Sequence, residues 1–122
     1  MSSASPHAIV PRRVRFPFEN ASSHWLDGRP ALTHLGNALH VLFPPGEKWF
    51  VRLANEALPK IPDPALRAAT RGFVGQEALH AKTHEAFCAV LERQGFPVER
   101  MGRVMEREIE RRERILPFSM QL

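Results

Sequence analysis

The chain has 122 residues, enough for one domain with its own core, and its 43% hydrophobic and 25% charged residues exclude a wholly disordered protein. A single cysteine excludes an intramolecular disulfide framework and any zinc site built on several cysteines. The net charge of +4 is spread along the chain, and towards the C-terminus arginines interleave with glutamates as on a solvated surface, so a nucleic-acid partner is not expected.

Hydropathy indicates neither a membrane anchor nor a secretory leader. No apolar run approaches the ~18–20 residues that a transmembrane helix needs. Residues 1–15 lack the apolar stretch of a signal peptide. We therefore expect a cytoplasmic protein without a membrane partner, in a reducing compartment that suits the single cysteine.

The beginning of the chain is rich in residues that disrupt regular structure. Prolines and serines are frequent before residue 31, so this segment is a poor candidate for helix or sheet. We expect a partly ordered arm over residues 1–29, in which residues 12–18 (RRVRFPF) form an extended stretch packed through its aromatic side chains. A helical domain is expected over residues 30–122.

Two helices separated by a break are predicted next. Pro30 suits the first position of a helix because its φ is fixed, and it begins a segment rich in Ala, Leu and His that reaches Phe43. Pro44-Pro45-Gly46 is expected to end this helix, because an internal proline removes a hydrogen bond and clashes with the preceding turn. A second helix is expected from about Gly46 to Leu58, followed by a proline-rich loop.

The clearest predicted element follows this loop. Asp63 is a good N-cap, Pro64 a good first residue and Gly95 a typical stop, so a continuous helix is expected from about Asp63 to Gln94. A last helix is expected from about Val98 to Leu116, with Glu and Arg pairs at helical spacing. Without an alternating strand pattern, the fold class is predicted to be all-α, a helical bundle.

A seam at heptad spacing runs along the predicted helix 63–94, apolar towards its ends and polar at its centre. Its members are Leu66, Thr70, Phe73, Glu77, His80, His84, Phe87 and Leu91. Glu77 and His80 can reach one point beside the helix, and Glu-x-x-His is the spacing by which di-iron and di-manganese bundles hold metal. His84, one turn further, is a candidate third ligand, a partner of the ligands or a proton shuttle.

A buried carboxylate with two imidazoles is costly unless something compensates it, and for this reason the seam suggests a metal site. It predicts that Phe73, Phe87 and Leu91 are buried. The alternative is a rotated helix whose polar seam faces water and whose interior residues are Val74, Ala78, Ala81 and Cys88. In either orientation Cys88 has no obvious base partner and is interpreted as a small buried side chain.

Other candidate ligands are less specific. Glu47 has apolar neighbours, but taken alone it is better explained as a first-turn glutamate favoured by the helix dipole. His34 and His40 are expected to be packing or surface residues, because the predicted proline break removes any helical phase between His40 and Glu47.

Several blocks of the sequence resemble, in order, a bacterial family of predicted metal-dependent hydrolases. They are residues 37–47 (NALHVLFPPGE), 63–67 (DPALR), 72–80 (GFVGQEALH) and 84–87 (HEAF). With residues 12–16 and Trp25, the resemblance covers about residues 12–116. It implies a ferritin-like bundle with a di-metal carboxylate centre, in which Glu47 and Glu77-x-x-His80 are ligands. The family is labelled hydrolase, although this ligand set looks at least as much like that of an oxygen-activating di-iron enzyme.

The resemblance also implies that this chain is the N-terminal half of the family pattern. Family members run to about twice this length, and their second half supplies the other Glu and Glu-x-x-His that a di-metal bundle needs. His40 stands where the family usually has Ser. The half-bundle would be completed by a missing C-terminal half or by a second copy, and we predict a homodimer that brings two Glu77-x-x-His80 motifs together.

Two functions follow as expectations. The first is a metal-dependent enzyme, a hydrolase or a di-iron-type oxidase acting on an unidentified small molecule. Its metal ligands would be Glu47, Glu77, His80 and His84, and its divalent metal Fe, Mn or Zn. The second is a non-enzymatic helical interaction module or degenerate half-domain, favoured by the apolar end Ile115-Leu116-Pro117-Phe118. Arginine content alone supports a third, weak nucleic-acid binding.

Overall fold

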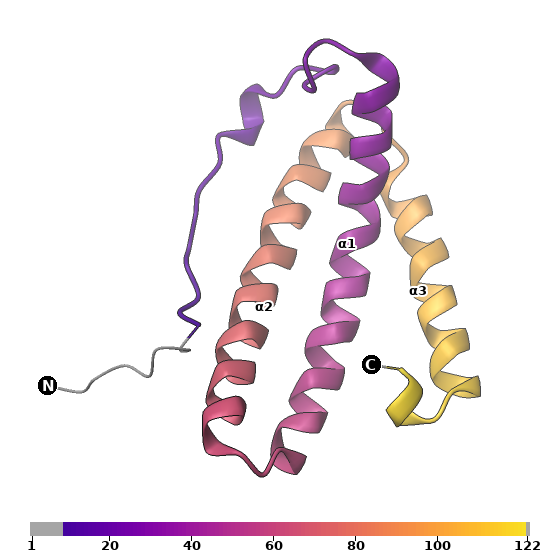
Figure 1. Cartoon of the computed structure of the whole chain (residues 1–122). Coiled ribbons are helices and arrows are strands. Elements are labelled where there is room, and N and C mark those ends of the chain that lie inside the picture. Colours follow the sequence, from indigo (N-terminus) through magenta and orange to yellow (C-terminus); the bar gives the residue numbers. More distant parts are fainter. Residues whose placement is uncertain (1–8, 122) are drawn as a thin grey trace, which may run out of the picture.

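The computed structural model describes residues 9–121, and these contain helices and connecting segments but no strand. Three long helices form the bundle: α1 (Pro30–Ala57), α2 (Pro64–Arg93) and α3 (Val98–Ile115). Single 3-10 turns lie at η1 (Phe18–Asn20), η2 (Leu58–Lys60) and η3 (Phe118–Met120). α2 runs antiparallel to α1, and α3 returns along the other side of α1 (Figure 1). The predicted all-α helical bundle is confirmed, and none of the described helices has a stretch long and apolar enough to cross a membrane.

The predicted break at Pro44-Pro45-Gly46 is wrong. α1 continues through both prolines as one helix of 28 residues, and the two predicted helices are its halves. An internal proline costs a helix about 3 kcal/mol or more, so a compensating interaction is needed.

That compensation comes from the neighbouring helices. Pro44 has no N–H to donate to the carbonyl of His40, but the Cys88 thiol of α2 donates to this oxygen at 3.2 Å. Pro44 itself is buried, and α3 packs nearby, since a Cβ at Gly46 would be in ordinary van der Waals contact with the Met105 methyl carbon, 3.6 Å away. The unbroken helix keeps His40 and Glu47, two turns apart, on one face.

α2 and α3 agree with the predicted elements. The Asp63 carboxylate accepts hydrogen bonds from the amides of Ala65 at 2.8 Å and Leu66 at 3.4 Å, as expected of an N-cap. Gly95 follows α2 with a φ of +87°, a conformation that favours glycine and turns the chain into α3. Both helices therefore begin and end within one or two residues of their predicted bounds.

The seam of α2 is only partly buried. Phe87 and Leu91 are 3% and 0% exposed as predicted, but Phe73 is 39% exposed and Leu66 is 55% exposed, so the prediction that Phe73 is buried is wrong. Three residues of the alternative face, on which a rotated helix would pack, are buried instead: Val74, Ala81 and Cys88. The polar centre of the seam consequently lies at the boundary between packed interface and solvent.

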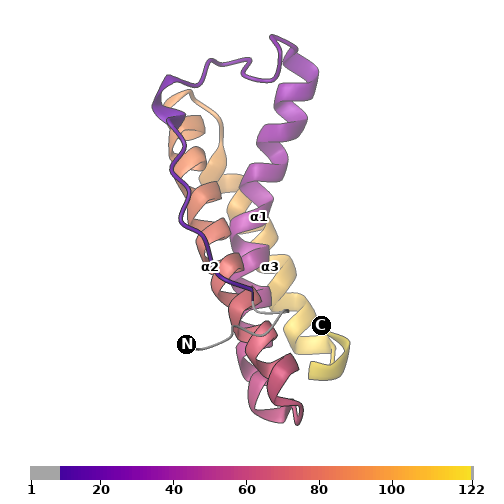
Figure 2. The ribbon, with the colours of Figure 1, turned by 60° about the vertical axis from the view of Figure 1, so that its left-hand side comes forward.

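The arm from Ile9 to Arg29 runs beside α2 before turning into α1 (Figure 2). Its Phe16 and Phe18 rings stack at 5.3 Å, and Phe18 contacts Phe87 of the core with ring centroids 5.1 Å apart. Trp25 also packs on Phe87 and donates from its indole N–H to Asn37 Oδ1 at 2.8 Å. The expected aromatic packing of the arm is therefore present. Residues 1–8 lie outside the described residues, so their partial order stays a prediction.

Candidate metal centre

Glu47 of α1 meets two histidines of α2 near the middle of both helices. Glu47 Oε1 lies 3.0 Å from His80 Nδ1 and 3.6 Å from His84 Nε2, and the two histidine Nε2 atoms are 3.0 Å apart. One ligand atom from each of the three residues lies within 4.8 Å of the others. Ligand atoms around one ion are about 3–4 Å apart when each metal bond is ~2.0–2.2 Å, so small side-chain movements would let all three bind the same cation.

Glu77, the remaining predicted ligand, is next to this group. Its Oε2 lies 3.6 Å from His80 Nδ1, on the same side of that ring as Glu47. The structure thus brings all four predicted site residues into one cluster, with Glu47, His80 and His84 as its compact part. Because His80 is exposed, the cluster is accessible from solvent.

The Glu47 carboxylate is placed as a cation ligand would be. Its side chain is only 12% exposed, and its Oε2 is buried and finds no hydrogen-bond partner among residues 9–121. Burial raises the pKa of Glu47, and the carboxylate of Glu77 raises it further, whereas His80 lowers it. A buried carboxylate oxygen without a partner is destabilising, and a bound cation would satisfy it.

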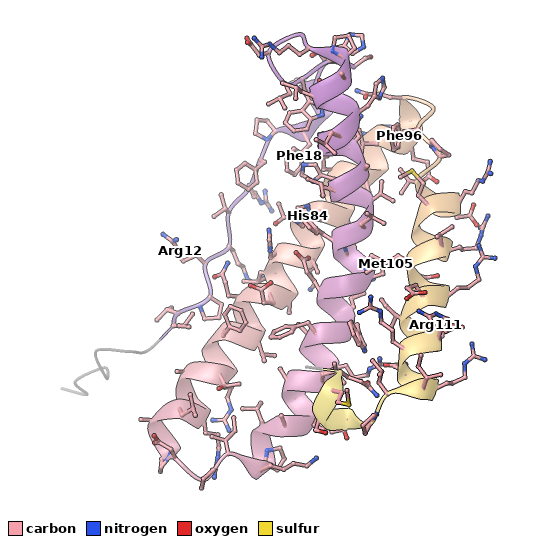
Figure 3. All side chains as sticks on the ribbon, turned by 45° about the vertical axis from the view of Figure 1, so that its right-hand side comes forward. Arg12, Phe18, His84, Phe96, Met105 and Arg111 are labelled. Carbon is pink, nitrogen blue, oxygen red and sulfur yellow. The ribbon has the colours of Figure 1, made fainter. Side chains whose placement is uncertain are left out.

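His84 is held as a neutral imidazole. Burial lowers its pKa to about 4, and the neighbouring His40 and His80 rings lower it as well. A histidine must lose its proton to bind a metal, so at neutral pH His84 already has the required protonation state. It lies midway along α2, on the side that faces α1 (Figure 3).

His40 belongs to the site although the sequence prediction placed it outside. Its Nδ1 lies 2.7 Å from His84 Nδ1, and burial lowers the pKa of His40. With the shared proton on His84, the bond fixes that ring and leaves Nε2 with a free lone pair towards Glu47. The sequence does contain a signal for His40: it precedes Glu47 by seven residues, which is two turns of one helix. The wrongly predicted break between them made this spacing look meaningless.

Two further candidates lie outside the centre as expected. Cys88 contributes its thiol hydrogen bond to α1, and burial raises its pKa to about 11, so it is a buried packing residue. His34 is exposed and stacks on Phe96 with ring centroids 6.2 Å apart.

The centre lies between two grooves on different sides. One, of about 820 Å³, runs between the arm and α2 and is lined on the helix side by His80. The other, of about 440 Å³, lies over α1 between α2 and α3 and is lined mainly by apolar side chains, with Glu47 and Glu77 as its charged lining residues. Ligands could therefore approach the cluster from either side.

Comparison with known proteins identifies one match. A family described as predicted metal-dependent hydrolase matches residues 10–122, a span that contains every candidate ligand. No curated protein and no solved structure shows significant similarity to the chain. Since the match covers nearly its whole length, the chain belongs to the predicted metal-dependent hydrolase family.

Proposed function

We propose that this protein is a metal-dependent enzyme, a hydrolase as its family is described, that holds a divalent metal between α1 and α2. The proposed ligands are Glu47, His80 and His84, with Glu77 beside them. The observation that carries the proposal is the buried Oε2 of Glu47, which has no hydrogen-bond partner within residues 9–121, on a carboxylate that already contacts both histidines. The family match over residues 10–122 supports it independently.

The donor set suits a borderline cation. Two imidazoles and carboxylate oxygens fit Fe, Mn or Zn better than the all-oxygen shells that Mg and Ca prefer. A cation bound here would lower the pKa of water and polarise a carbonyl or phosphoryl oxygen, the chemistry that hydrolysis needs. The partly buried Glu77 carboxylate is the group best placed to take up a proton beside it, while His40 orients His84.

We further propose that two copies of the chain complete a di-metal centre. A di-metal bundle takes a Glu from each of two helices and Glu-x-x-His from each of two others, and one copy supplies half of this set. The second copy would bind the apolar groove over α1, because Glu47 and Glu77 line that groove beside exposed apolar side chains. Those side chains are Leu39, Phe43 and Phe73.

A two-fold axis through this groove would bring both pairs of carboxylates together and bury apolar area at the same time. If a separate C-terminal half of the kind that the family resemblance implies is the partner instead, it would occupy the same face. With two cations bridged by carboxylates, oxygen activation of the di-iron type becomes the alternative to hydrolysis.

The test combines metal analysis with a mass measurement in solution. Protein purified without chelator should contain Fe, Mn or Zn, and the metal-free protein should bind added Zn²⁺ or Mn²⁺ in a calorimetric titration. Glu47→Gln and His84→Gln should each lose this binding. The matched controls Glu56→Gln, an exposed site on α1, and His24→Gln, an exposed site on the arm, should keep it.

A folded protein that binds neither metal would overturn the enzyme proposal. The exposed apolar groove would then support the second candidate function, a helical interaction module. Retention of metal by Glu47→Gln and His84→Gln together would instead place the site elsewhere.

A further inference from the structure

The arm contacts α2 so closely that two positions of the helix require glycine. A Cβ at Gly72 would overlap the carbonyl oxygen of Ile9, and one at Gly75 would lie 2.8 Å from Pro11 Cγ. One turn further, the Arg12 amide donates to Gln76 Oε1 at 3.0 Å. The arm is therefore fixed against this face of the helix as a wall rather than lying loosely over it.

Between this wall and α2 lies the groove of about 820 Å³. Its lining carries four basic residues and one acidic residue, Glu19. The basic residues are Arg12, Arg13, Arg15 and Lys82. None of the four forms an ion pair within residues 9–121, so their charge is not neutralised by the protein. Low-dielectric walls around charge of one sign attract a ligand of the opposite sign.

The same groove also has apolar lining residues, from both the arm and α2. The stacked rings of Phe16 and Phe18 line it, and Phe18 points from the arm towards the helices (Figure 3). Leu79 and His80 line it from α2. A ligand that placed an anionic group on the arginines could lay an apolar part along these rings and reach His80.

The other two grooves have the wrong charge for an anion. The apolar groove contains Glu47 and Glu77 as its charged residues. A third, of about 450 Å³ between the three helices, is lined by four glutamates against Lys48 and Arg103. Of these three grooves, the one beside the arm is therefore the basic one.

We propose that this groove binds the anionic group of a small substrate, a carboxylate or a phosphate ester attached to an apolar body. As the substrate of the metal centre, this ligand rests on the proposed function, but its binding to the groove does not require the metal. The arm then selects the substrate by charge, and His80, which lines the groove from α2, connects it to the metal centre.

The experiment uses metal-free protein of full length, prepared with EDTA, and three probes of similar size: phenyl phosphate, benzoate and neutral benzyl alcohol. Binding is followed by amide chemical shifts in a two-dimensional NMR titration. Both anions should bind more tightly than the alcohol, shift amides of residues 12–19 and 76–86, and weaken as salt is raised. The two anions distinguish a phosphate from a carboxylate preference.

The variant Arg13→Gln/Arg15→Gln should weaken anion binding about fivefold, as expected for the loss of two partly exposed ion pairs. Arg100→Gln/Arg107→Gln on α3 removes the same charge away from the groove and should bind the anions as the wild type does. Equal weakening in both variants, equal binding of the alcohol, or binding of an oligonucleotide in place of the small anions would each overturn the proposal. If the anions bind as expected but no metal binds, the anion-binding groove is supported and the proposed metal-dependent enzyme is overturned.

Discussion

The thiol of Cys88 donates a hydrogen bond to the carbonyl of His40, the acceptor that Pro44 leaves without its helical donor. A residue of α2 thereby repairs a gap in α1 and holds His40 where it meets His84. This contact between the helices therefore supports both the continuity of α1 and the arrangement of the proposed metal ligands.

This contact can be measured with a double-mutant cycle. Cys88→Ala should lower the free energy of unfolding by about 1–2 kcal/mol, because it leaves a buried carbonyl unpaired and a small cavity. In a Pro44→Ala background the helix regains its own N–H donor, so Cys88→Ala should cost less there. Urea unfolding of the four proteins gives the coupling energy. Equal costs in both backgrounds would show that the thiol does not compensate for the proline.

The protonation of Cys88 gives a prediction about pH. Burial raises the pKa of the thiol to about 11 from a usual value near 9, so the folded protein holds this proton more tightly than the unfolded chain does. The stabilisation is fully present below pH ~9 and is lost as pH rises towards 11. Iodoacetamide should therefore modify native protein very slowly at pH 8 and denatured protein quickly. Fast modification of native protein at that pH would contradict the burial.

Two glycine variants test how the arm is attached. Gly102→Ala, at an open position of α3, should raise stability by up to ~1 kcal/mol through helix propensity alone. Gly72→Ala has the same propensity gain but overlaps Ile9, so it should displace the arm and speed tryptic cleavage after Arg12, Arg13 and Arg15. Cleavage of both variants at the wild-type rate would mean that the arm does not need this contact.

The hydrogen bond between His84 and His40 should affect metal affinity. His40→Leu removes the group that orients His84 without removing a proposed ligand, and should weaken Zn²⁺ binding by about 10–100-fold. His34→Leu, at an exposed position earlier on α1, is the matched control and should leave the affinity unchanged. Calorimetry on both variants decides between an orienting role and mere proximity, since unchanged affinity in His40→Leu would exclude the orienting role.

If the protein is a homodimer as proposed, two residues one turn apart on the seam have different roles: Glu77 binds metal and Phe73 holds the two copies together. Glu77→Ala should abolish metal binding yet leave the dimer largely intact, because apolar area would hold the two copies together. Phe73→Glu should break the dimer and lose the metal as well, since it places a charge in the apolar groove. Val104→Glu, at another exposed apolar site, on α3 and outside the residues that line this groove, should do neither.

Light scattering and metal analysis on the same samples give both results. A monomeric wild type with stoichiometric metal would refute the shared centre, although it would leave the ligand assignment of a single copy standing.

Local signals in the sequence were sufficient for α2 and α3. Asp63 caps the amides within its own first turn, and Gly95 readily adopts the positive φ that ends α2 because it has no Cβ. The intervals from Glu77 to His80 and His84 likewise place three candidate ligands on one side of α2 once that helix forms. These features depend on residues only a few positions apart, and for that reason the local sequence pattern predicts them.

The path of α1 and the buried face of α2 were decided by tertiary structure. A proline pair ends a helix on local grounds, but the hydrogen bond from Cys88, 48 positions away from its acceptor His40, helps the helix continue. That continuity puts His40 and Glu47 on one face, and the packing of α1 against α2 leaves Phe73 outside. The sequence determined which side chains could bind a metal, whereas packing between the helices decided how they are brought together, because that packing offsets the local cost of the prolines.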